Sequence, residues 1–403
     1  MKKLSLMEVI DGIEDTRRNR SVIYPLHEVL IIMLLAVICG ATSYAKVEMF
    51  GKSKKEWLGT FLELENGIPD ACTFRNVIKE INTQKLHLLF CKWMKSVAKE
   101  LYGVVAIDGK QARRTKDAKK RPLHVVSAFS AEYGIVLGQL ACEEKSNEIT
   151  AIPKLLEMLE IKGCIVTIDA IGTQTDIAKS IIDNGADYIL ALKENQKTLY
   201  NDIKLYLDDI HQEKKLLESE NYYRTVEKGH GRIEIRECVI SDEISWLHNK
   251  SAWKGLYGVG AIYCTIEKGS TISKQSHYFI YSCKGLNAQQ IMKYKRNHWS
   301  IENNLHWGLD MAFREDESRA RKDNSAENFN VIRQIAFNIL KSETSFKGGI
   351  TDKQFKCLLD SSTLIKLLPI GFVHNLFTHS KTLPLNLSQL AKFSFIWYTK
   401  KYL

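Results

Sequence analysis

The stretches VVAIDGK (residues 104–110) and CIVTIDAIG (residues 164–172) decide the fold that this sequence predicts. Each contains a short apolar run that ends at an aspartate, Asp108 in the first and Asp169 in the second. Apolar runs of this length bounded by glycine are typical of buried strands. Two carboxylates held at neighbouring strand ends repel each other, and a divalent cation is the usual reason for such an arrangement. We therefore expect both aspartates at one edge of a sheet, where they would bind a metal.

Strands and helices alternate around these two runs. Strands are predicted over residues 104–107, 123–130, 135–141, 165–168 and 188–192, and helices over residues 148–159 and 174–184. Three strands followed by helix, strand, helix and strand indicate an α/β fold with an antiparallel start and a parallel continuation. Ribonuclease H-like domains have this order of elements.

The rest of the chain flanks this predicted core. Residues 1–100 are expected to form an all-α domain with helices over 26–41, 47–64 and 74–101, the last with Thr73 as its N-cap. The apolar run at 29–41 has 13 residues, too few to span a bilayer, and predicts a buried helix.

A β-rich region follows the predicted core. Its strands are expected over residues 222–227, 232–240, 256–266 and 276–282, so residues 218–285 resemble an insertion. The predicted domains are residues 1–100, a catalytic domain at 101–341 that contains this insertion, and a divergent tail at 342–403.

Glu302 is the candidate for a third carboxylate, on a predicted helix beyond the insertion. Asp, Asp and Glu on separate elements suggest Mg²⁺-dependent phosphoryl transfer, because Mg²⁺ prefers oxygen ligands. Other acidic residues follow closely and compete for this role: Asp310, Glu315, Asp316 and Glu317.

Two further patterns surround Glu302. His298 and His306 lie four residues before and after it, which leaves a zinc site as a minor alternative, although the HExxH pattern is missing. Trp299 and Trp307 are expected to pack in the core, with stacking on DNA bases as the alternative.

Composition favours a polyanionic partner. Lys and Arg number 57 against 47 Asp and Glu, a net charge of +10, and the isoelectric point is about 9.0. Nine cysteines without a CxxC pair, and a start without a signal-peptide pattern, predict a cytoplasmic protein with no membrane contact, and a DNA partner would associate it with the nucleoid.

Basic and polar residues near the predicted site are candidates for DNA contact. Residues 110–121 hold seven Lys or Arg and one Asp, directly after Asp108, which favours phosphate binding over an ordinary solvated loop. The loop at 193–197 either contacts DNA or caps the next helix, and residues 228–232 form either a hairpin turn or a DNA-contacting tip. The predicted DNA-binding residues are Lys110, Arg113, Arg114, Lys119, Lys120, Arg121, Lys193, Asn195, Gln196, His230, Arg232, Arg296 and His298.

The helical region at 1–100 is a candidate for recognition of specific DNA sequence, since such readout usually enters the major groove through a helix. Packing on the core or dimerisation is the alternative. Its basic residues include Arg17, Arg18, Arg20, Lys52, Lys54, Lys55 and Arg75.

Several motifs resemble the H-repeat-associated transposases of bacterial insertion sequences, a branch of the DDE transposases. They include AIDGKQARR (106–114), TIDAIGTQ (167–174), GADYILALKENQ (185–196), GHGRIEIRE (229–237) and RNHWSIENNLHWGLDMAFREDESRAR (296–321). The resemblance extends over about residues 10–341. It departs from a signature of related transposases, in which Tyr, Arg and Lys accompany the glutamate, because those positions hold Lys295, His298 and Leu309 here.

The resemblance implies a ribonuclease H-like core with a β-rich insertion, and a DDE triad of Asp108, Asp169 and Glu302. It implies Mg²⁺-dependent cutting and joining of double-stranded DNA, at the inverted repeats of an element and in target DNA, with Mn²⁺ as a substitute ion and a homodimer on paired ends. Three alternatives stay open: a site-specific metal-dependent nuclease, an inactive transposase-derived DNA-binding protein, and a hydrolase of small phosphoesters.

Overall fold

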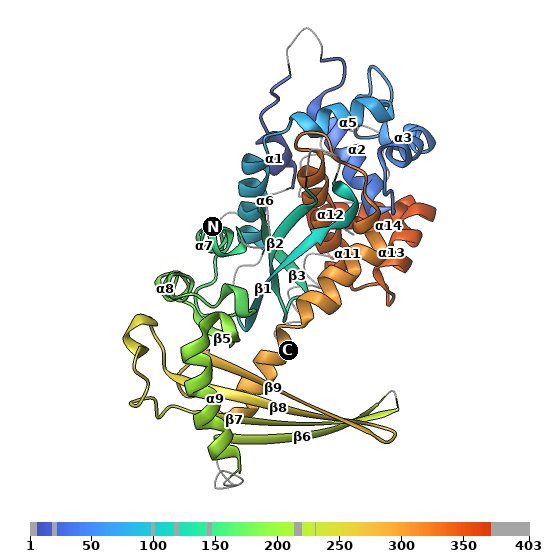
Figure 1. Ribbon diagram of the computed structural model, residues 1–403. Helices are drawn as coiled ribbons and strands as arrows, with labels where there is room; N and C mark the ends of the chain where they lie inside the picture. Colours follow the sequence, from blue (N-terminus) through green and yellow to red (C-terminus); the bar gives the residue numbers. More distant parts are fainter. Residues whose placement is uncertain are drawn as a thin grey trace, which may run out of the picture.

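A nine-stranded sheet runs through the molecule. The structure is a computed structural model, and it describes residues 6–17, 22–97, 101–116, 121–142, 147–212, 220–229 and 231–371. The strand order is β3-β2-β1-β4-β5-β9-β8-β7-β6. Helices pack on both sides of its first half, and Figure 1 shows the other half reaching away from the helical end of the molecule. The predicted α/β class is confirmed.

The first half of the sheet contains the two predicted aspartate strands. β1 (Val104–Ala112), β2 (Leu123–Ser130) and β3 (Ile135–Cys142) are antiparallel, and β4 (Ile165–Ile168) and β5 (Asp187–Leu192) continue parallel to β1. Helix α7 (Glu148–Met158) leads into β4, and α8 (Thr175–Asp183) connects β4 with β5. These bounds lie close to the predicted ones except for β1, which continues past Asp108 because residues 109–112 still pair with β2.

The predicted insertion extends the same sheet. β6 (Tyr222–Gly229), β7 (Arg232–Ser241), β8 (Gly258–Lys268) and β9 (Thr271–Tyr281) are antiparallel neighbours, and β9 pairs with β5. β9 begins five residues before its predicted start, because residues 271–275, which are exposed and polar except for Ile272, pair with β8 without the apolar alternation that marks a strand.

Two helices cover opposite faces of this half. Helix α9 (Lys197–Gln212) contacts Tyr263, whose hydroxyl donates to Asp208 at 2.8 Å. Helix α10 (Ala288–Asn297) forms an ion pair with Glu227 on β6 through its Arg296. The residue across from Glu227 on β7 is in turn the register partner of Ile266 on β8. Since side chains alternate between the two faces along a strand, positions 263 and 266 face opposite ways.

The described residues up to 97 form helices α1 (Leu6–Asp11), α2 (Leu26–Ile38), α3 (Tyr44–Ser53), α4 (Lys55–Leu58), α5 (Ala71–Glu80) and α6 (Thr83–Val97). In α2 every residue from 28 to 38 is buried, which confirms the predicted buried helix. The predicted helix over 74–101 is two helices. The N-cap prediction at Thr73 is wrong: Asp70 caps α5 and accepts from the Thr73 N–H at 2.7 Å, because Thr73 lies inside the first turn.

Helix α12 (Ser325–Ser342) lies at the centre of the helical end, against α2, α5, α6 and β3 (Figure 1). Its buried amides bond to backbone in its neighbours: Asn328 donates to Ile78 O at 2.8 Å, and Asn338 donates to Val136 O at 2.8 Å. Side chains from α2, α5 and α6 therefore share one hydrophobic core with the sheet. The predicted domain division stays a prediction.

Helices α11 (Trp307–Phe313), α13 (Ile350–Leu359) and α14 (Ser361–Gly371) complete the described chain. No helix within the described ranges is both long and apolar enough to span a membrane.

Candidate active site

Asp108 and Asp169 follow the last paired residues of two adjacent parallel strands. Ile107 in β1 and Ile168 in β4 are register partners at the end of their ladder, and each aspartate is the next residue. Both side chains are partly buried. The expectation that these strands deliver their carboxylates at one level of the sheet is confirmed, although β1 itself runs on to Ala112.

Glu302 lies in a π-helical turn, Ile301–His306, between α10 and α11. Ile301 and Leu305 are buried on one side of this turn, while Glu302 is exposed. A π-helical turn widens the helix and is frequent at functional sites. The sequence predicted a helix here but not this turn, since no residue preference distinguishes it.

Burial and neighbouring charges raise the pKa of Asp108 to about 7. Burial is the largest cause, and the charges of Asp169, Glu302 and Glu148 act in the same direction, while a hydrogen bond from the Gly109 N–H opposes them. The three predicted carboxylates therefore interact electrostatically. Asp310, the closest rival of Glu302, is not among the causes.

The donor set of the three carboxylates consists of oxygen atoms alone, which suits a hard cation such as Mg²⁺ better than zinc. Across the part of the chain that the structure describes, no group of three or more His, Cys, Asp or Glu side chains is arranged to hold a metal. This holds for the three carboxylates and for the zinc alternative at His298, Glu302 and His306 alike. The carboxylates fit a divalent cation by charge and donor type.

The two histidines beside Glu302 have separate environments. His298 is 7% exposed, and its Nδ1 lies 3.1 Å from the Thr167 hydroxyl on β4. His306 Nδ1 lies 3.7 Å from Asp108 Oδ2. Burial lowers the pKa of both imidazoles to about 3, with smaller contributions from Lys295 at His298 and from Lys110 at His306. Both rings are thus neutral at physiological pH, whereas the sequence predicted both as minor candidates for zinc ligands and His298 also as a DNA contact.

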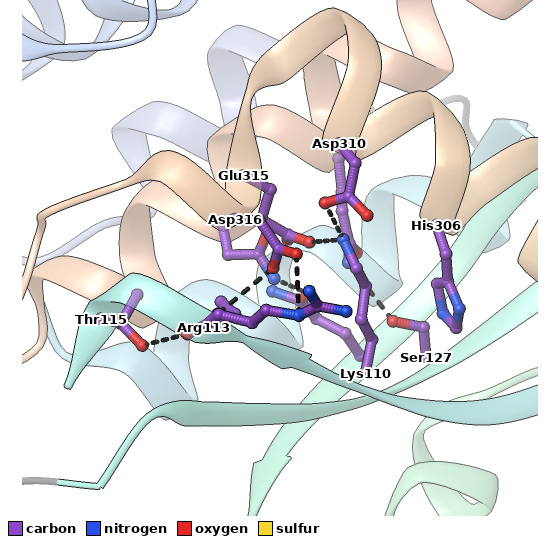
Figure 2. A network of polar contacts seen from close by, with 12 residues as sticks. Lys110, Arg113, Thr115, Ser127, His306, Asp310, Glu315 and Asp316 are labelled. Carbon is purple, nitrogen blue, oxygen red and sulfur yellow. Dashed lines mark hydrogen bonds and ion pairs between the residues drawn. The ribbon is translucent and has the colours of Figure 1, made fainter.

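Lys110 points from β1 toward the segment that follows the π-helical turn (Figure 2). Its ammonium pairs with Asp310 at 2.5 Å and with Glu315, and its side chain is 14% exposed. Arg113, by contrast, is 81% exposed and pairs with Asp316 at 3.3 Å. The start of the basic run is therefore already neutralised in part by acidic residues at 310–316, which the sequence had offered as rivals of Glu302.

The other predicted DNA contacts in the first half of the sheet differ in exposure. Arg114, Arg121 and Lys193 are exposed. Asn195 and Gln196 brace the loop after Asp169: their side-chain amides donate to Ala170 O at 2.5 Å and to Thr173 O at 3.0 Å. Lys119, Lys120 and His230 lie outside the described residues.

The predicted contacts near the insertion are in ion pairs. Arg232 pairs with Glu234 at 2.5 Å, and Arg296 pairs with Glu227 at 2.5 Å. His298, as described above, is buried. The DNA-contact assignments all stay predictions.

The two tryptophans around Glu302 are not core residues. Trp299 is 44% exposed and Trp307 is 63% exposed, so the expectation of core packing is wrong. They occupy the outer side of the helix whose inner side holds Ile301 and Leu305, which explains why hydrophobicity alone misled the prediction.

Lys295 is a further cation near the carboxylates. It is half-buried on α10, and burial lowers its pKa to about 8, while the Asp169 charge acts in the opposite direction and that of Lys193 in the same direction. The sequence marked this position only as a departure from the signature of related transposases.

Comparisons with known proteins match nearly the whole chain. The family described as "Transposase DDE domain" matches residues 99–339, and the family described as "DDE_Tnp_1-associated" matches residues 7–94. The protein named "H repeat-associated putative transposase YhhI" of Escherichia coli K12 is 38% identical, over 91% of this chain and 98% of that protein. "Putative transposase YncI" of Escherichia coli O157:H7 is 36% identical, over 90% of this chain and 94% of that protein. Among solved structures, a piggyBac transposase synaptic complex with hairpin DNA aligns with a TM-score of 0.41 and 9% identity, over 97% of this chain and 81% of that one.

Proposed function

The chain belongs to the DDE transposase family and is an insertion-sequence transposase, and we propose that Asp108, Asp169 and Glu302 are the carboxylates that carry DNA cleavage and strand transfer. The observation that carries this proposal is that Asp108 and Asp169 directly follow the register partners Ile107 and Ile168 of two parallel strands, and the charges of Asp169 and Glu302 both act to raise the pKa of Asp108. Like charges kept together in a partly buried place are typical of a functional site.

The strand order supports a ribonuclease H-like core for residues 101–341. Three antiparallel strands, β3, β2 and β1, are followed by the parallel strands β4 and β5, with a helix before and after β4. The β-rich insertion comes between β5 and the helix that bears Glu302, and it adds strands to the β5 edge.

Asp108, Asp169 and Glu302 would hold a divalent cation, Mg²⁺ with Mn²⁺ as a substitute. When bound, such ions activate the attacking oxygen and stabilise the leaving one. Residues next to the carboxylates would support this site. His306 is neutral and contacts Asp108 without adding charge, and the amides of Asn195 and Gln196 hold the backbone that follows Asp169.

The substrate is double-stranded DNA, bound at the inverted repeats of the element and at the target, by a homodimer on paired ends in the bacterial nucleoid. The cations Arg114, Arg121 and Lys193 have exposed side chains, which suits them to phosphate contact. In the helical region, Arg75 is exposed, while Arg17 and Lys52 pair with Asp15 and Glu48. We propose recognition of the element's ends by this region. Arg18 and Arg20 lie outside the described residues.

The test compares Glu302→Gln with Asp310→Asn, two neutralisations on neighbouring helical turns. We expect Glu302→Gln to abolish cleavage of end DNA in Mg²⁺ while DNA binding, measured by gel shift, stays within about threefold, because only the chemical step uses this carboxylate. Asp310→Asn should retain cleavage, since Asp310 pairs with Lys110. The opposite pattern would move the third carboxylate to position 310.

A second assay separates a transposase reaction from simple nuclease activity. Pre-cut element ends with a free 3′-OH are incubated with supercoiled plasmid, and joined products are measured by gel. We expect strand transfer by the wild type and none by Glu302→Gln. Cleavage without joined products would favour the site-specific nuclease, and DNA binding without either reaction would favour an inactive DNA-binding protein.

A further inference from the structure

A small cavity lies between β1, β2, α11 and α12, and His306, which contacts Asp108, is one of its lining residues. The space open to the centre of a water molecule is about 10 Å³, close to the least that one water needs. Its apolar lining consists of Ala112, Val125 and Leu309. The polar lining residues are Lys110, Ser127, His306, Glu315, Asn330 and Gln334.

Three buried polar atoms that line this cavity have no hydrogen-bond partner among the described residues: His306 Nε2, Asn330 Oδ1 and Gln334 Oε1. Asn330 is 3% exposed and Gln334 is fully buried. The amide nitrogens of both are used, by Gln139 Oε1 at 3.2 Å and by Ser127 Oγ at 3.4 Å, so their oxygens are left as acceptors. A buried polar group without a partner is destabilising, and three on residues around one cavity point to a shared ligand.

Lys110 provides the matching donor. An ammonium has three N–H bonds, and two of them are directed to Asp310 and Glu315 (Figure 2). The third N–H can serve the cavity, which Lys110 lines. The site thus offers one donor and three acceptors, and a single water molecule, with two hydrogens and two lone pairs, can satisfy the donor and two of the acceptors.

We propose that this cavity binds one water molecule, which accepts from Lys110 Nζ and donates to His306 Nε2 and Gln334 Oε1. Such a water fixes the tautomer of His306. With Nε2 accepting from the water, the ring proton lies on Nδ1, where it faces the Asp108 carboxylate 3.7 Å away. The reverse tautomer would direct a lone pair at that carboxylate.

The water then makes His306 a positioning residue for Asp108. This consequence rests on the proposed catalytic role of Asp108, whereas the water site itself does not. The connection runs from the buried helix α12 through Gln334 and the water to His306, and so gives Asp108 a rigid support from the centre of the helical end.

The direct test is a high-resolution crystal structure of the full chain. We expect one ordered water within hydrogen-bonding distance of Lys110 Nζ, His306 Nε2 and Gln334 Oε1. A cavity without such density, or a Gln334 side chain that bonds His306 directly, would overturn the proposal, whether or not the protein cleaves DNA.

The tautomer is tested by NMR on protein labelled with ¹⁵N-histidine. We expect the His306 shifts of an Nδ1–H imidazole, and a change in them in Gln334→Met, which keeps side-chain length but removes the acceptor. Asn338→Leu is the matched control, because it removes another buried α12 amide that does not line the cavity. Unchanged His306 shifts in Gln334→Met, or an Nε2–H tautomer in the wild type, would refute the assignment.

Cleavage kinetics test the positioning role separately. In Gln334→Met we expect the rate at saturating DNA to fall by about 10-fold to 100-fold with DNA affinity unchanged, because a small displacement of a catalytic group has effects of this size. Asn338→Leu should lower the melting temperature, but it should not lower the cleavage rate at saturating DNA while leaving DNA affinity unchanged. An unchanged rate in Gln334→Met would mean that the water leaves Asp108 unaffected.

Discussion

The two halves of the sheet hold charged side chains in different surroundings. In the first half, Lys110 is 14% exposed and its partner Glu315 is 3% exposed. In the insertion half, Arg296 and Glu227 form a pair of similar length, but they are 39% and 44% exposed. The chemical groups are alike, and only the covering by helices differs.

This difference decides what each ion pair does. A buried charge loses its hydration, so its partner is essential, and removing one partner is destabilising by about 3–5 kcal/mol. An exposed pair is screened by water and salt and stabilises a fold by about 0–1 kcal/mol. The Lys110–Glu315 pair therefore fixes groups in place at the site, whereas the Arg296–Glu227 pair joins exposed charges that water screens. The Arg236–Glu234 pair of the insertion half is buried and belongs with the first kind.

The largest effect on stability is expected for Lys110→Met, which keeps the length of the side chain and removes its charge. Glu315 would then lose its ion-pair partner, and only the charge of buried Arg333 would still act on it, so we expect the free energy of unfolding to fall by about 3 kcal/mol, the lower end of the range for a broken buried pair. Urea denaturation followed by circular dichroism measures this. A loss under about 1 kcal/mol would show that this pair behaves like an exposed one and would remove the contrast between the halves.

A second test uses Asp108 in metal-free protein. Its carboxyl pKa is raised from 3.8 to about 7, so the proton it keeps in the folded state stabilises the fold below pH 3.8, and this stabilisation is lost as the pH rises through 7. We expect Asp108→Asn, which is neutral throughout, to be more stable than the wild type by about 2–4 kcal/mol at pH 8 in chelator. At pH 4 the two proteins should unfold at nearly the same urea concentration. A pH-independent difference would argue against like-charge repulsion at this site.

The same contrast explains how much the sequence could predict. Apolar runs located β1, β2, β4 and β5 to within a few residues, apart from the C-terminal end of β1, because burial on both faces leaves a strong pattern. The early start of β9 was missed because its first residues are exposed and, except for Ile272, polar. At the site, the sequence identified Asp108 and Asp169 from their places at strand ends.

The contacts that surround the candidate site could not be predicted from the sequence. The partners of Lys110 are 200 and 205 residues away along the chain, and a basic run looks the same whether its charges face water or buried acids. The π-helical turn around Glu302 and the contact of His306 with Asp108 likewise depend on how α10 and α11 pack on the sheet. Such long-range contacts decide protonation and orientation, which residue types alone do not.

A third test compares exposed cations in the two halves by DNA binding. Arg114→Gln with Lys193→Gln, near the first half, should weaken binding to all DNA sequences alike and reduce the salt dependence by a slope of roughly one per lost phosphate contact. Arg232→Gln should change the slope by less, because Glu234 already neutralises Arg232. Fluorescence anisotropy at several salt concentrations measures both. A loss confined to the element's own ends would instead assign sequence readout to the residues changed.

The smallest effect is expected where the insertion meets α10. Arg296→Gln and Glu227→Gln each break an exposed pair, so we expect each to lower the free energy of unfolding by less than about 1 kcal/mol, and 0.5 M salt should reduce even that effect. The double variant isolates the interaction between the two residues, since their separate effects should add to within about 0.5 kcal/mol if the pair contributes little. Arg236 complicates the single variants because it also contacts Glu227, at 3.0 Å. An interaction energy above about 2 kcal/mol would show that this ion pair joins the insertion to α10 as strongly as the ion pair of Lys110 joins β1 to α11. The contrast between the two pairs would then fail.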